Sequence, residues 1–277
     1  MKFDVLSSLG VRCYATCFLV LGLGNLQAQT AVDTELVLLV EHRTSGSSDF
    51  DLILDSVADA FEQQSFIDSV AAGSLGSIAA TLILFNSNSG QTLAIPWLEL
   101  SSASDLQGFA NTVRSVRNLT SGGGNVDYAG AIAAGAAQTA SAAFEGTIRQ
   151  LTIIDDGTGF FEASPAATQN ARDAALASSV DVINAVVFDT QGVSQTQTAE
   201  DYYNANVVGG ADGSVSVIAN NLNPRPAEIT TAIEGSIITA VTSPTVNASA
   251  SASAIPEPSS FFLTLVAGMG LLIRRRR

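Results

Sequence analysis

The stretch from Glu35 to Ser45, ELVLLVEHRTS, is a near-continuous apolar run that ends abruptly in charged and hydroxyl residues. Such a run is typical of a strand buried on both faces, at the centre of a parallel sheet covered by helices. Ligands on open α/β sheets bind beyond the carboxyl ends of the strands. We therefore expect any binding site of this fold to lie near Glu41 to Ser45.

Other short apolar runs predict five further strands, at residues 77–85, 91–98, 149–154, 180–188 and 214–218. Apolar residues at helical spacing predict helices at 49–72 (one or two helices), 102–116, 126–143, 163–179, 199–206 and 224–241. Pro96 cannot donate to a sheet ladder, which places the strand 91–98 at an edge. The short turn at 86–90 implies that this strand is antiparallel to the one before it.

Strands that alternate with helices predict right-handed crossovers and a doubly wound α/β fold. We expect a mostly parallel six-stranded sheet with one antiparallel edge strand. The predicted domain covers residues 32–241. Residues 242–254, rich in Ser and Ala, form a linker that cannot bury enough apolar surface to fold.

The first 28 residues resemble a secretory signal peptide, with Lys2 and Arg12 before an apolar run and small residues after it. The alternative is a buried N-terminal segment of the core. Both cysteines, Cys13 and Cys17, lie in this stretch. An exported, cleaved protein would have no thiol, which excludes disulfides, thiolate metal sites and cysteine nucleophiles.

The charge of the chain is strongly acidic. Of its 26 acidic residues only two lie in the terminal segments, whereas six of its 12 basic residues do, so the body carries a net charge near −18 and no lysine. Nucleic acid is excluded as a partner, because binding it requires Lys and Arg to neutralise phosphates. Cations, or an anionic matrix bridged by cations, fit this charge. Alternatively, the acidity only keeps a secreted protein soluble.

Residues 255–277 have three parts: Pro256-Glu257-Pro258, an apolar stretch within 259–273, and Arg274, Arg275, Arg276 and Arg277. The basic end would stay cytoplasmic, leaving the body outside. This arrangement resembles the PEP-CTERM sorting signal of Gram-negative bacteria. The resemblance implies recognition by an exosortase, transient membrane contact through 259–273, removal of the tail, and release to the cell surface or an exopolysaccharide matrix. The alternative is an ordinary C-terminal membrane anchor.

Residues 32–241 resemble the von Willebrand factor type A domain, and more particularly an uncharacterised bacterial family of unknown function built on that fold. ELVLLVE, IAATLILF followed by LAIPW, the glycine-rich loop before DYAGAI, LTIIDDG and DYYNANVVGG carry the resemblance. Many such domains bind a divalent ion in a metal-ion-dependent adhesion site. Its pattern is Asp-x-Ser-x-Ser after the first strand, a Thr between the middle helices, and an Asp after the fourth strand. Mg²⁺ prefers such hard oxygen ligands.

Carried over to this chain, the pattern is altered. Glu41 stands in place of the first Asp, Ser45 matches the second Ser, Asn125 or a neighbour occupies the Thr loop, and Asp156 matches the last Asp. Arg43 replaces the first Ser with a positive charge. We therefore expect a degenerate site without a resident cofactor, in which the Arg43 guanidinium takes the place of Mg²⁺ beside Glu41 or Asp156. A functional Mg²⁺ site is the alternative.

The remaining motifs are weaker indications of function. Asp155 and Asp156 could form an acid pair, but neighbours on an extended strand point to opposite faces, which favours a turn. His42 is the only histidine and suits a structural role at the strand end, although a Ser-His-Asp triad could use no other base. The glycines at 122–124 lack the Gly-Lys-Ser/Thr of a phosphate-binding loop. Tyr202 and Tyr203 are expected to pack or cap a helix.

The sequence therefore predicts an exported, surface-sorted protein that acts in binding or matrix structure and is not an enzyme. Its partner would be a protein or polysaccharide of the extracellular matrix. A Mg²⁺-dependent adhesion module is one alternative. A hydrolase that cleaves matrix polysaccharide with two carboxylates, held about 5 to 5.5 Å apart in retaining enzymes, is another.

Overall fold

The computed structural model describes residues 28–42, 47–86, 90–119, 126–157, 164–189, 193–219 and 226–242. Its strands are β1 (Thr30–Glu41), β2 (Ile78–Phe85), β3 (Thr92–Leu100), β4 (Phe144–Asp155), β5 (Val182–Asp189), β6 (Gly209–Gly210) and β7 (Val215–Ala219). Its helices are α2 (Ser47–Glu62), α3 (Gln64–Ala72), α4 (Ala103–Ser115), α5 (Tyr128–Ala140), α6 (Pro165–Ser178), α7 (Val193–Asn206) and α8 (Pro226–Thr242), with a short 3₁₀ turn at Val116–Asn118. The predicted signal peptide, linker and sorting tail lie outside the described residues, apart from Ala28 and Thr242, the last residue of α8.

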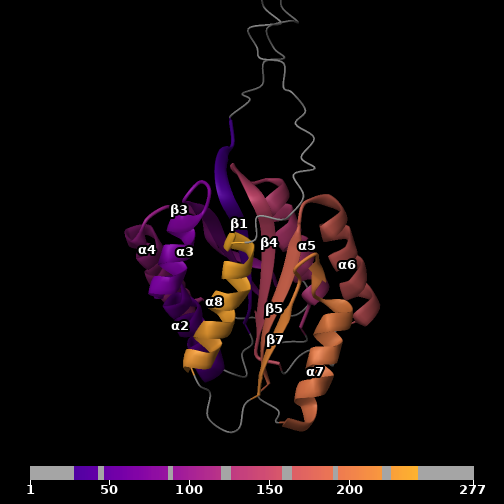
Figure 1. Cartoon of the computed structure of the whole chain (residues 1–277). Helices are drawn as coiled ribbons and strands as arrows, with labels where there is room; N and C mark the ends of the chain where they lie inside the picture. Colours follow the sequence, from indigo (N-terminus) through magenta and orange to yellow (C-terminus); the bar gives the residue numbers. More distant parts are fainter. Residues whose placement is uncertain are drawn as a thin grey trace, which may run out of the picture. The chain divides into compact units, whose positions relative to one another are not determined.

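The described strands form one mixed sheet in the order β3-β2-β1-β4-β5, and both β6 and β7 pair with β5 (Figure 1). The pairs of β1 with β2 and β4, of β4 with β5, and of β5 with β7 are parallel. β3 is the antiparallel edge strand, which confirms that prediction. The predicted count of six strands is corrected to seven, because the two-residue β6 adds an antiparallel pair beside β5.

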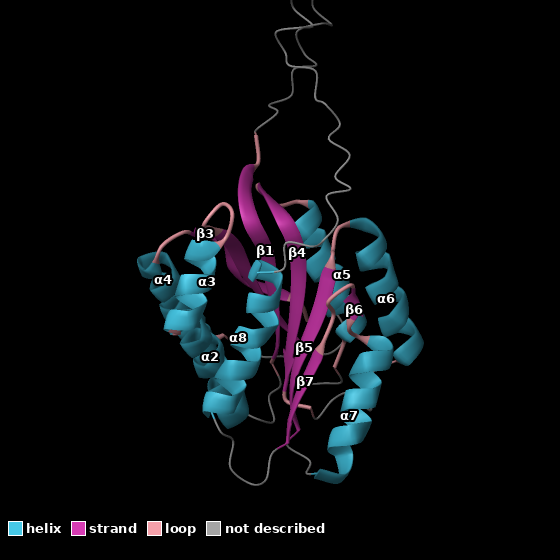
Figure 2. Ribbon diagram, in the orientation of Figure 1, coloured by secondary structure: helices cyan, strands magenta, loops and turns pink. Residues whose placement is uncertain are grey.

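Helices cover both faces of the sheet, which confirms the doubly wound architecture (Figure 2). On one face Leu36, Leu38 and Val40 of β1 pack in a core shared with α2, α3, α4 and α8. On the other, Val37 and Leu39 pack in a core shared with α5, α6 and α7. Because successive side chains of a strand point to opposite faces, burial on both sides accounts for the unbroken apolar run of β1.

Local sequence determines where several helices begin. The Ser102 hydroxyl accepts a hydrogen bond from the Asp105 amide and caps α4, and Asp127 caps α5 through the Gly130 amide at 2.8 Å. α6 begins with Pro165 after the cap Ser164, in keeping with the preference for proline in the first helical turn.

The small residues of α5 allow a close approach to the sheet. A Cβ atom added at Gly135 would lie 3.0 Å from the Leu151 side chain and 3.4 Å from Leu39, tighter than most real contacts. α5 is thereby held against β1 and β4, and its first residue, Tyr128, lies near the ends of those strands.

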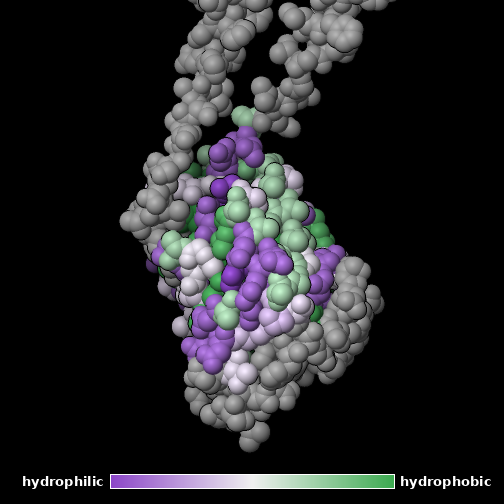
Figure 3. Space-filling view, turned by 90° about the vertical axis from the view of Figure 1, so that its right-hand side faces the viewer, coloured by the Kyte–Doolittle hydropathy of each residue, from purple (hydrophilic) through white to green (hydrophobic). Residues whose placement is uncertain are grey.

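The outer side of α6 is a mixed surface. Figure 3 shows hydrophilic and weakly apolar side chains interspersed over this side of the molecule. The exposed apolar residues of α6 are alanines, among them Ala166, Ala167, Ala174 and Ala177. Side chains this small expose little apolar area, so this side is an ordinary solvated face. Among the described residues, no helix combines the length and the hydropathy needed to cross a bilayer.

Candidate functional site

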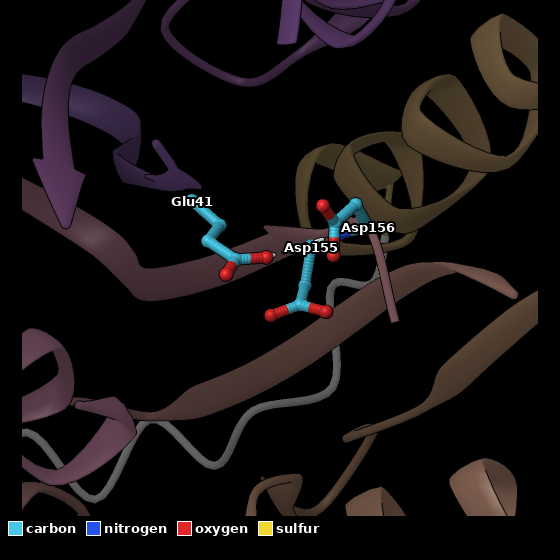
Figure 4. A group of neighbouring side chains, drawn as sticks. All are labelled: Glu41, Asp155 and Asp156. Carbon is cyan, nitrogen blue, oxygen red and sulfur yellow. Dashed lines mark hydrogen bonds between the residues drawn. The ribbon is translucent and has the colours of Figure 1, made fainter. Parts of the chain in front are cut away.

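The carboxyl ends of β1 and β4 bring three acidic side chains together. Glu41 is the last residue of β1, Asp155 is the last residue of β4, and Asp156 follows directly (Figure 4). One carboxylate oxygen from each residue can be chosen so that all three lie within 4.8 Å of one another. The side chains are buried, with exposed fractions of 2% for Glu41, 0% for Asp155 and 9% for Asp156.

The sheet register explains why Glu41 and Asp155 meet. Val40 of β1 pairs with Ile154 of β4, so the next residues, Glu41 and Asp155, lie level on adjacent parallel strands. Both also continue the alternation that points Val37 and Leu39, or Leu151 and Ile153, toward α5. The two carboxyl groups therefore emerge on the same face.

Asp156 joins the cluster because β4 ends one residue earlier. The chain turns at Gly157, whose φ of 71° lies in the left-handed region that favours glycine. The Gly157 amide donates to Asp155 Oδ1 at 2.5 Å, and the Asp156 amide donates to Glu41 Oε2 at 3.3 Å. The turn that the sequence favoured at Asp155 and Asp156 is confirmed, because β4 ends at Asp155 and the chain turns at Gly157.

The hydroxyl groups of two buried tyrosines lie next to Asp155. The Tyr128 hydroxyl donates to Asp155 Oδ2 at 2.7 Å, and the hydroxyls of Tyr128 and Tyr203 are hydrogen-bonded at 2.6 Å. Both side chains are fully buried, and their rings meet edge to face with centroids 5.6 Å apart. The cluster therefore joins β1, β4, α5 and α7.

Burial and mutual repulsion perturb the carboxyl groups. Burial, followed by the negative charges of Asp155 and Asp156, raises the pKa of Glu41 well above its ordinary value. Burial and the Asp156 charge raise the pKa of Asp155 to about 6, against the opposing effect of hydrogen bonds from Tyr128 and Gly157. Either a shared proton or a cation can relieve the repulsion.

The donor set fits a hard cation. Three carboxylates offer only oxygen ligands, the type that Mg²⁺ and Ca²⁺ prefer. Glu41, Asp155 and Asp156 would hold such an ion. Two of the predicted ligand positions, Glu41 and Asp156, are thus brought together, and Asp155 joins them although the sequence interpretation gave it no ligand role.

The remaining predicted positions, Arg43, Ser45 and Asn125, lie outside the described residues, so the proposed guanidinium substitution stays a prediction. His42 is 8% exposed and stacks on Phe50, with ring centroids 4.0 Å apart. Burial lowers its pKa.

Sequence comparison places the chain in a family. The profile of the family described as "Protein of unknown function (DUF1194)" matches residues 31–239, most of the chain. The chain belongs to the DUF1194 family. No curated protein matches this DUF1194 member.

Structural comparison shows the fold of this DUF1194 protein. It is similar to a von Willebrand factor type A protein from Catenulispora acidiphila (TM-score 0.50, 11% identity, covering 76% of this chain and 43% of that one). It is also similar to proximal thread matrix protein 1 from the mussel byssus (TM-score 0.50, 14% identity, 76% and 48%). A third neighbour is the pilus adhesin SpaC from Lactobacillus rhamnosus GG (TM-score 0.50, 10% identity, 76% and 30%). The chain thus has a von Willebrand type A fold and spans less than half the length of each of these proteins.

Proposed function

We propose that this protein is an exported binding module of the cell surface or extracellular matrix, which contacts its partner at the end of the sheet formed by Glu41, Asp155 and Asp156. The observation that carries the proposal is the meeting of three buried carboxyl groups at the carboxyl ends of β1 and β4. Ligand sites of open α/β sheets lie at this edge. The protein's membership in a family of unknown function leaves its partner open.

The third carboxyl group changes the balance between a degenerate site and a cation site. Glu41 and Asp156 alone could be neutralised by the single charge of Arg43. With Asp155 included, a guanidinium leaves negative charge uncompensated, whereas a divalent cation neutralises more of it. We therefore propose that the cluster takes a divalent cation. When bound, such an ion supplies a coordination position for an oxygen ligand of the partner.

A calorimetric titration distinguishes a divalent cation at the cluster from the Arg43 guanidinium. We expect Mg²⁺ or Ca²⁺ to bind the full chain with a Kd in the micromolar range and Asp156→Ala to abolish that binding. If the wild-type chain binds neither ion but Arg43→Ser does, the guanidinium occupies the site and the original interpretation of a degenerate site is correct. Asp173→Ala, which removes an exposed carboxylate paired with Arg172, is the matched control.

Export and sorting are part of this proposal and rest on the sequence of residues 1–28 and 255–277. The implied partners are the secretion machinery and an exosortase, with a protein or polysaccharide of the matrix as the final partner. The charges of the described residues favour such partners over nucleic acid. Each described arginine, Arg114, Arg117, Arg149 and Arg172, has a carboxylate within 4.0 Å, which leaves little positive charge for phosphates.

A carboxylate-based hydrolase is the second candidate, because Glu41 and Asp155 form a close carboxyl pair. A catalytic pair must flank a glycosidic bond in a cleft open to the substrate. Glu41 and Asp155 are 2% and 0% exposed, which gives a polysaccharide chain no direct access to the pair. An assay for new reducing ends on matrix polysaccharide tests this alternative, and activity lost in both Glu41→Gln and Asp155→Asn would establish it.

A further inference from the structure

The outer edge of the sheet is a nearly uncharged surface of an acidic molecule. β3 ends the sheet on this side, and among the described strands it pairs only with β2 (Figure 1). Two of its leucines lie in the open, Leu93 with an exposed fraction of 47% and Leu98 with 38%. We propose that this edge is a self-association surface, through which two copies of the chain form a twofold-symmetric dimer.

The edge surface comprises the exposed residues of β3 and of the middle of α4, which packs beside it. Glu99 is the only charged residue of β3, and residues 106–113 of α4 carry no charge. A Cβ atom added at Gly108 would meet no neighbouring atom within 4 Å, so the helix presents an open face there. The uncharged exposed side chains of the edge surface are Thr92, Leu93, Pro96, Leu98, Gln107 and Asn111.

Exposed carboxylates gather elsewhere, on α2, α7 and α8. Those that are at least partly exposed include Asp55, Asp59, Glu200, Asp201 and Glu228. A basic partner would bind these helices, and an acidic partner would be repelled by the body's net charge near −18. The edge surface instead fits a partner surface that is itself apolar and nearly uncharged. A second copy of the same edge meets this requirement, and it keeps the acidic α7, at the other end of the sheet, away from the contact (Figure 1).

The sequence of β3 is nearly symmetric about its midpoint. Pro96 is the fifth of the nine residues of the strand, with Leu93 on one side of it and Leu98 on the other. An antiparallel arrangement about a twofold axis at Pro96 sets Leu93 of each copy beside Leu98 of the other, so the same contact occurs twice. It also keeps the two Glu99 carboxylates about 20 Å apart, the rise of six extended residues.

Pro96 also determines how the two copies meet. The Ile95 carbonyl points toward β2, where it accepts a hydrogen bond from Thr81 Oγ1 at 2.7 Å. The carbonyl and the nitrogen of one trans peptide point in opposite directions, so the Pro96 nitrogen points outward. Proline has no N–H to donate, which interrupts main-chain pairing with another strand at this position. Side chains therefore carry the contact, and the sheet is not extended from copy to copy.

The size of the edge surface indicates a weak dimer. A strip as long as nine extended residues and as wide as a strand beside a helix measures about 30 Å by about 15 to 20 Å. An area of about 450 to 600 Å² per copy is below the roughly 800 Å² of a standard interface, which places the contact among transient associations. Such a dimer forms where copies are concentrated, as on a cell surface or in a matrix.

The dimer would give the molecule two partner sites. A twofold axis perpendicular to β3 reverses the direction of the strands in the second copy. The carboxyl ends of β1 and β4, where Glu41, Asp155 and Asp156 meet, would then point in opposite directions. Two such sites would bridge two matrix partners and strengthen attachment through multivalency. This consequence rests on the proposed function, whereas the dimer itself does not.

Sedimentation of the full chain, kept in a nonionic detergent that shields its apolar tail, measures the dimer. We expect a monomer–dimer equilibrium with a dissociation constant of about 10 to 1,000 μM, in the range of weak contacts. Leu93→Asp places a charge from each copy in the contact and should raise that constant about tenfold or more. Leu75→Asp is the matched control, because Leu75 is 52% exposed but outside the edge surface, and it should leave the constant within about twofold.

Salt and cross-linking test the nature of the contact. Raising NaCl from about 20 mM to about 500 mM should strengthen the dimer, because it screens the repulsion between two acidic bodies. With Cys13→Ser and Cys17→Ser the chain has no thiol of its own. In that background a short thiol cross-linker should join Leu93→Cys of one chain to Leu98→Cys of another, and it should leave Leu75→Cys monomeric.

A wild-type chain that stays monomeric at about 1 mM overturns the proposal. So does a dimer that dissociates as salt rises, or one that Leu75→Asp weakens as much as Leu93→Asp. If deletion of residues 255–277 abolishes an association that Leu93→Asp leaves intact, the apolar tail joins the copies and the edge surface does not. The cation titration is independent of these measurements, so either proposal can fail alone.

Discussion

Glu35 is a carboxyl group buried in the middle of β1, with an exposed fraction of 1%. Its Oε1 accepts a hydrogen bond from the Gly146 amide at 2.6 Å, while no described residue forms a hydrogen bond with its Oε2. Burial raises its pKa, opposed by the Gly146 hydrogen bond and the positive charge of Arg149, while Glu145 and Asp181 add to the rise. The group therefore makes folding sensitive to pH.

The sign of this effect follows from linkage. The folded-state pKa of Glu35 lies above the unfolded value of about 4.3, so its contribution to stability is complete below that pH and is lost as the pH rises through the folded pKa. Glu35→Gln keeps an acceptor for Gly146 and removes the titration. We expect the free energy of unfolding of the variant to fall less between pH 4 and pH 7.5, as measured by urea denaturation. A parallel decline in both proteins would contradict this.

Asp33 organises the turn between α3 and β2. Its carboxylate accepts hydrogen bonds from the amides of Leu75 at 2.9 Å and Ser77 at 3.4 Å. A Cβ atom at Gly73 would lie 2.3 Å from Asp33 Oδ2, so the turn also needs a glycine there. Asp33→Ala would leave the buried Ser77 amide without this acceptor, and we expect a loss of about 1 to 3 kcal/mol in unfolding free energy. Asp68→Ala, at an exposed position of α3, is the control, expected within about 0.5 kcal/mol of wild type.

At this scale the sequence located two of the three residues of the carboxyl cluster, Glu41 and Asp156. Glu41 and Asp156 follow strongly apolar runs, so the ends of two central strands could be located from pattern alone. Asp155 could also have been found, because it continues the two-residue alternation of Leu151 and Ile153. That alternation places it on the face that Glu41 occupies. The end of the strand at Asp155 and the contact of Tyr128 with Tyr203 depend on tertiary structure, which no local pattern contains.

The elements themselves follow the sequence pattern closely, except where burial is incomplete. β4 begins at Phe144 rather than near Arg149, because its first half alternates between partly buried and exposed residues and lacks an apolar run. α7 begins at Val193, six residues before the predicted start, in a polar segment with little periodicity. β6 has two glycines and no side chains that could produce a pattern.

α8 is held on the sheet by polar as well as apolar contacts. The backbone carbonyl of Ser236 accepts hydrogen bonds from Gln150 Nε2 of β4 and Asn184 Nδ2 of β5, both at 2.9 Å. Asn184 Oδ1 also accepts from the Ser214 amide at 2.9 Å, just before β7. One buried amide therefore links α8, β5 and the start of β7.

Substitution of Asn184 should loosen all three elements together. Asn184→Leu removes the three hydrogen bonds of this side chain, including one from the Ser214 hydroxyl, and leaves the Ser214 amide without this acceptor. We therefore expect a loss of about 2 to 4 kcal/mol in unfolding free energy. Hydrogen exchange should accelerate in α8 and β7 and remain near wild type in α4 on the far edge. Asn170→Ala, at an exposed position of α6, is the matched control. Unchanged protection of α8 would show that its apolar contacts alone hold it.

For the whole molecule, we propose that the body and the tail have separate tasks. The described residues form a folded domain with its own two-sided core. In this proposal the tail of residues 255–277 acts as a sorting signal, through Pro256-Glu257-Pro258, a short apolar stretch and the terminal arginines. A short apolar stretch anchors weakly against the approximately 20 residues of an ordinary span, which suits a segment that is cut rather than retained.

The prediction for the tail concerns processing. In a host with an exosortase, we expect wild-type protein to lose the tail and leave the membrane fraction. Replacement of Pro256, Glu257 and Pro258 by alanine should block cleavage, so the protein keeps its tail mass and stays in the membrane fraction. Replacement of Arg274–Arg277 by serine should impair processing for a different reason, because the positive charges hold that end on the cytoplasmic side.

Mass spectrometry of the released and membrane-bound forms measures both effects. Ser249→Gly in the linker is the matched control and should be processed like wild type. The decisive comparison is the same set of variants in a host without an exosortase. There all of them should remain uncleaved, because the apolar stretch and its basic end provide membrane contact but no cutting activity. Equal release of wild type and the triple-alanine variant in the first host would instead identify the tail as an ordinary anchor shed by general proteolysis.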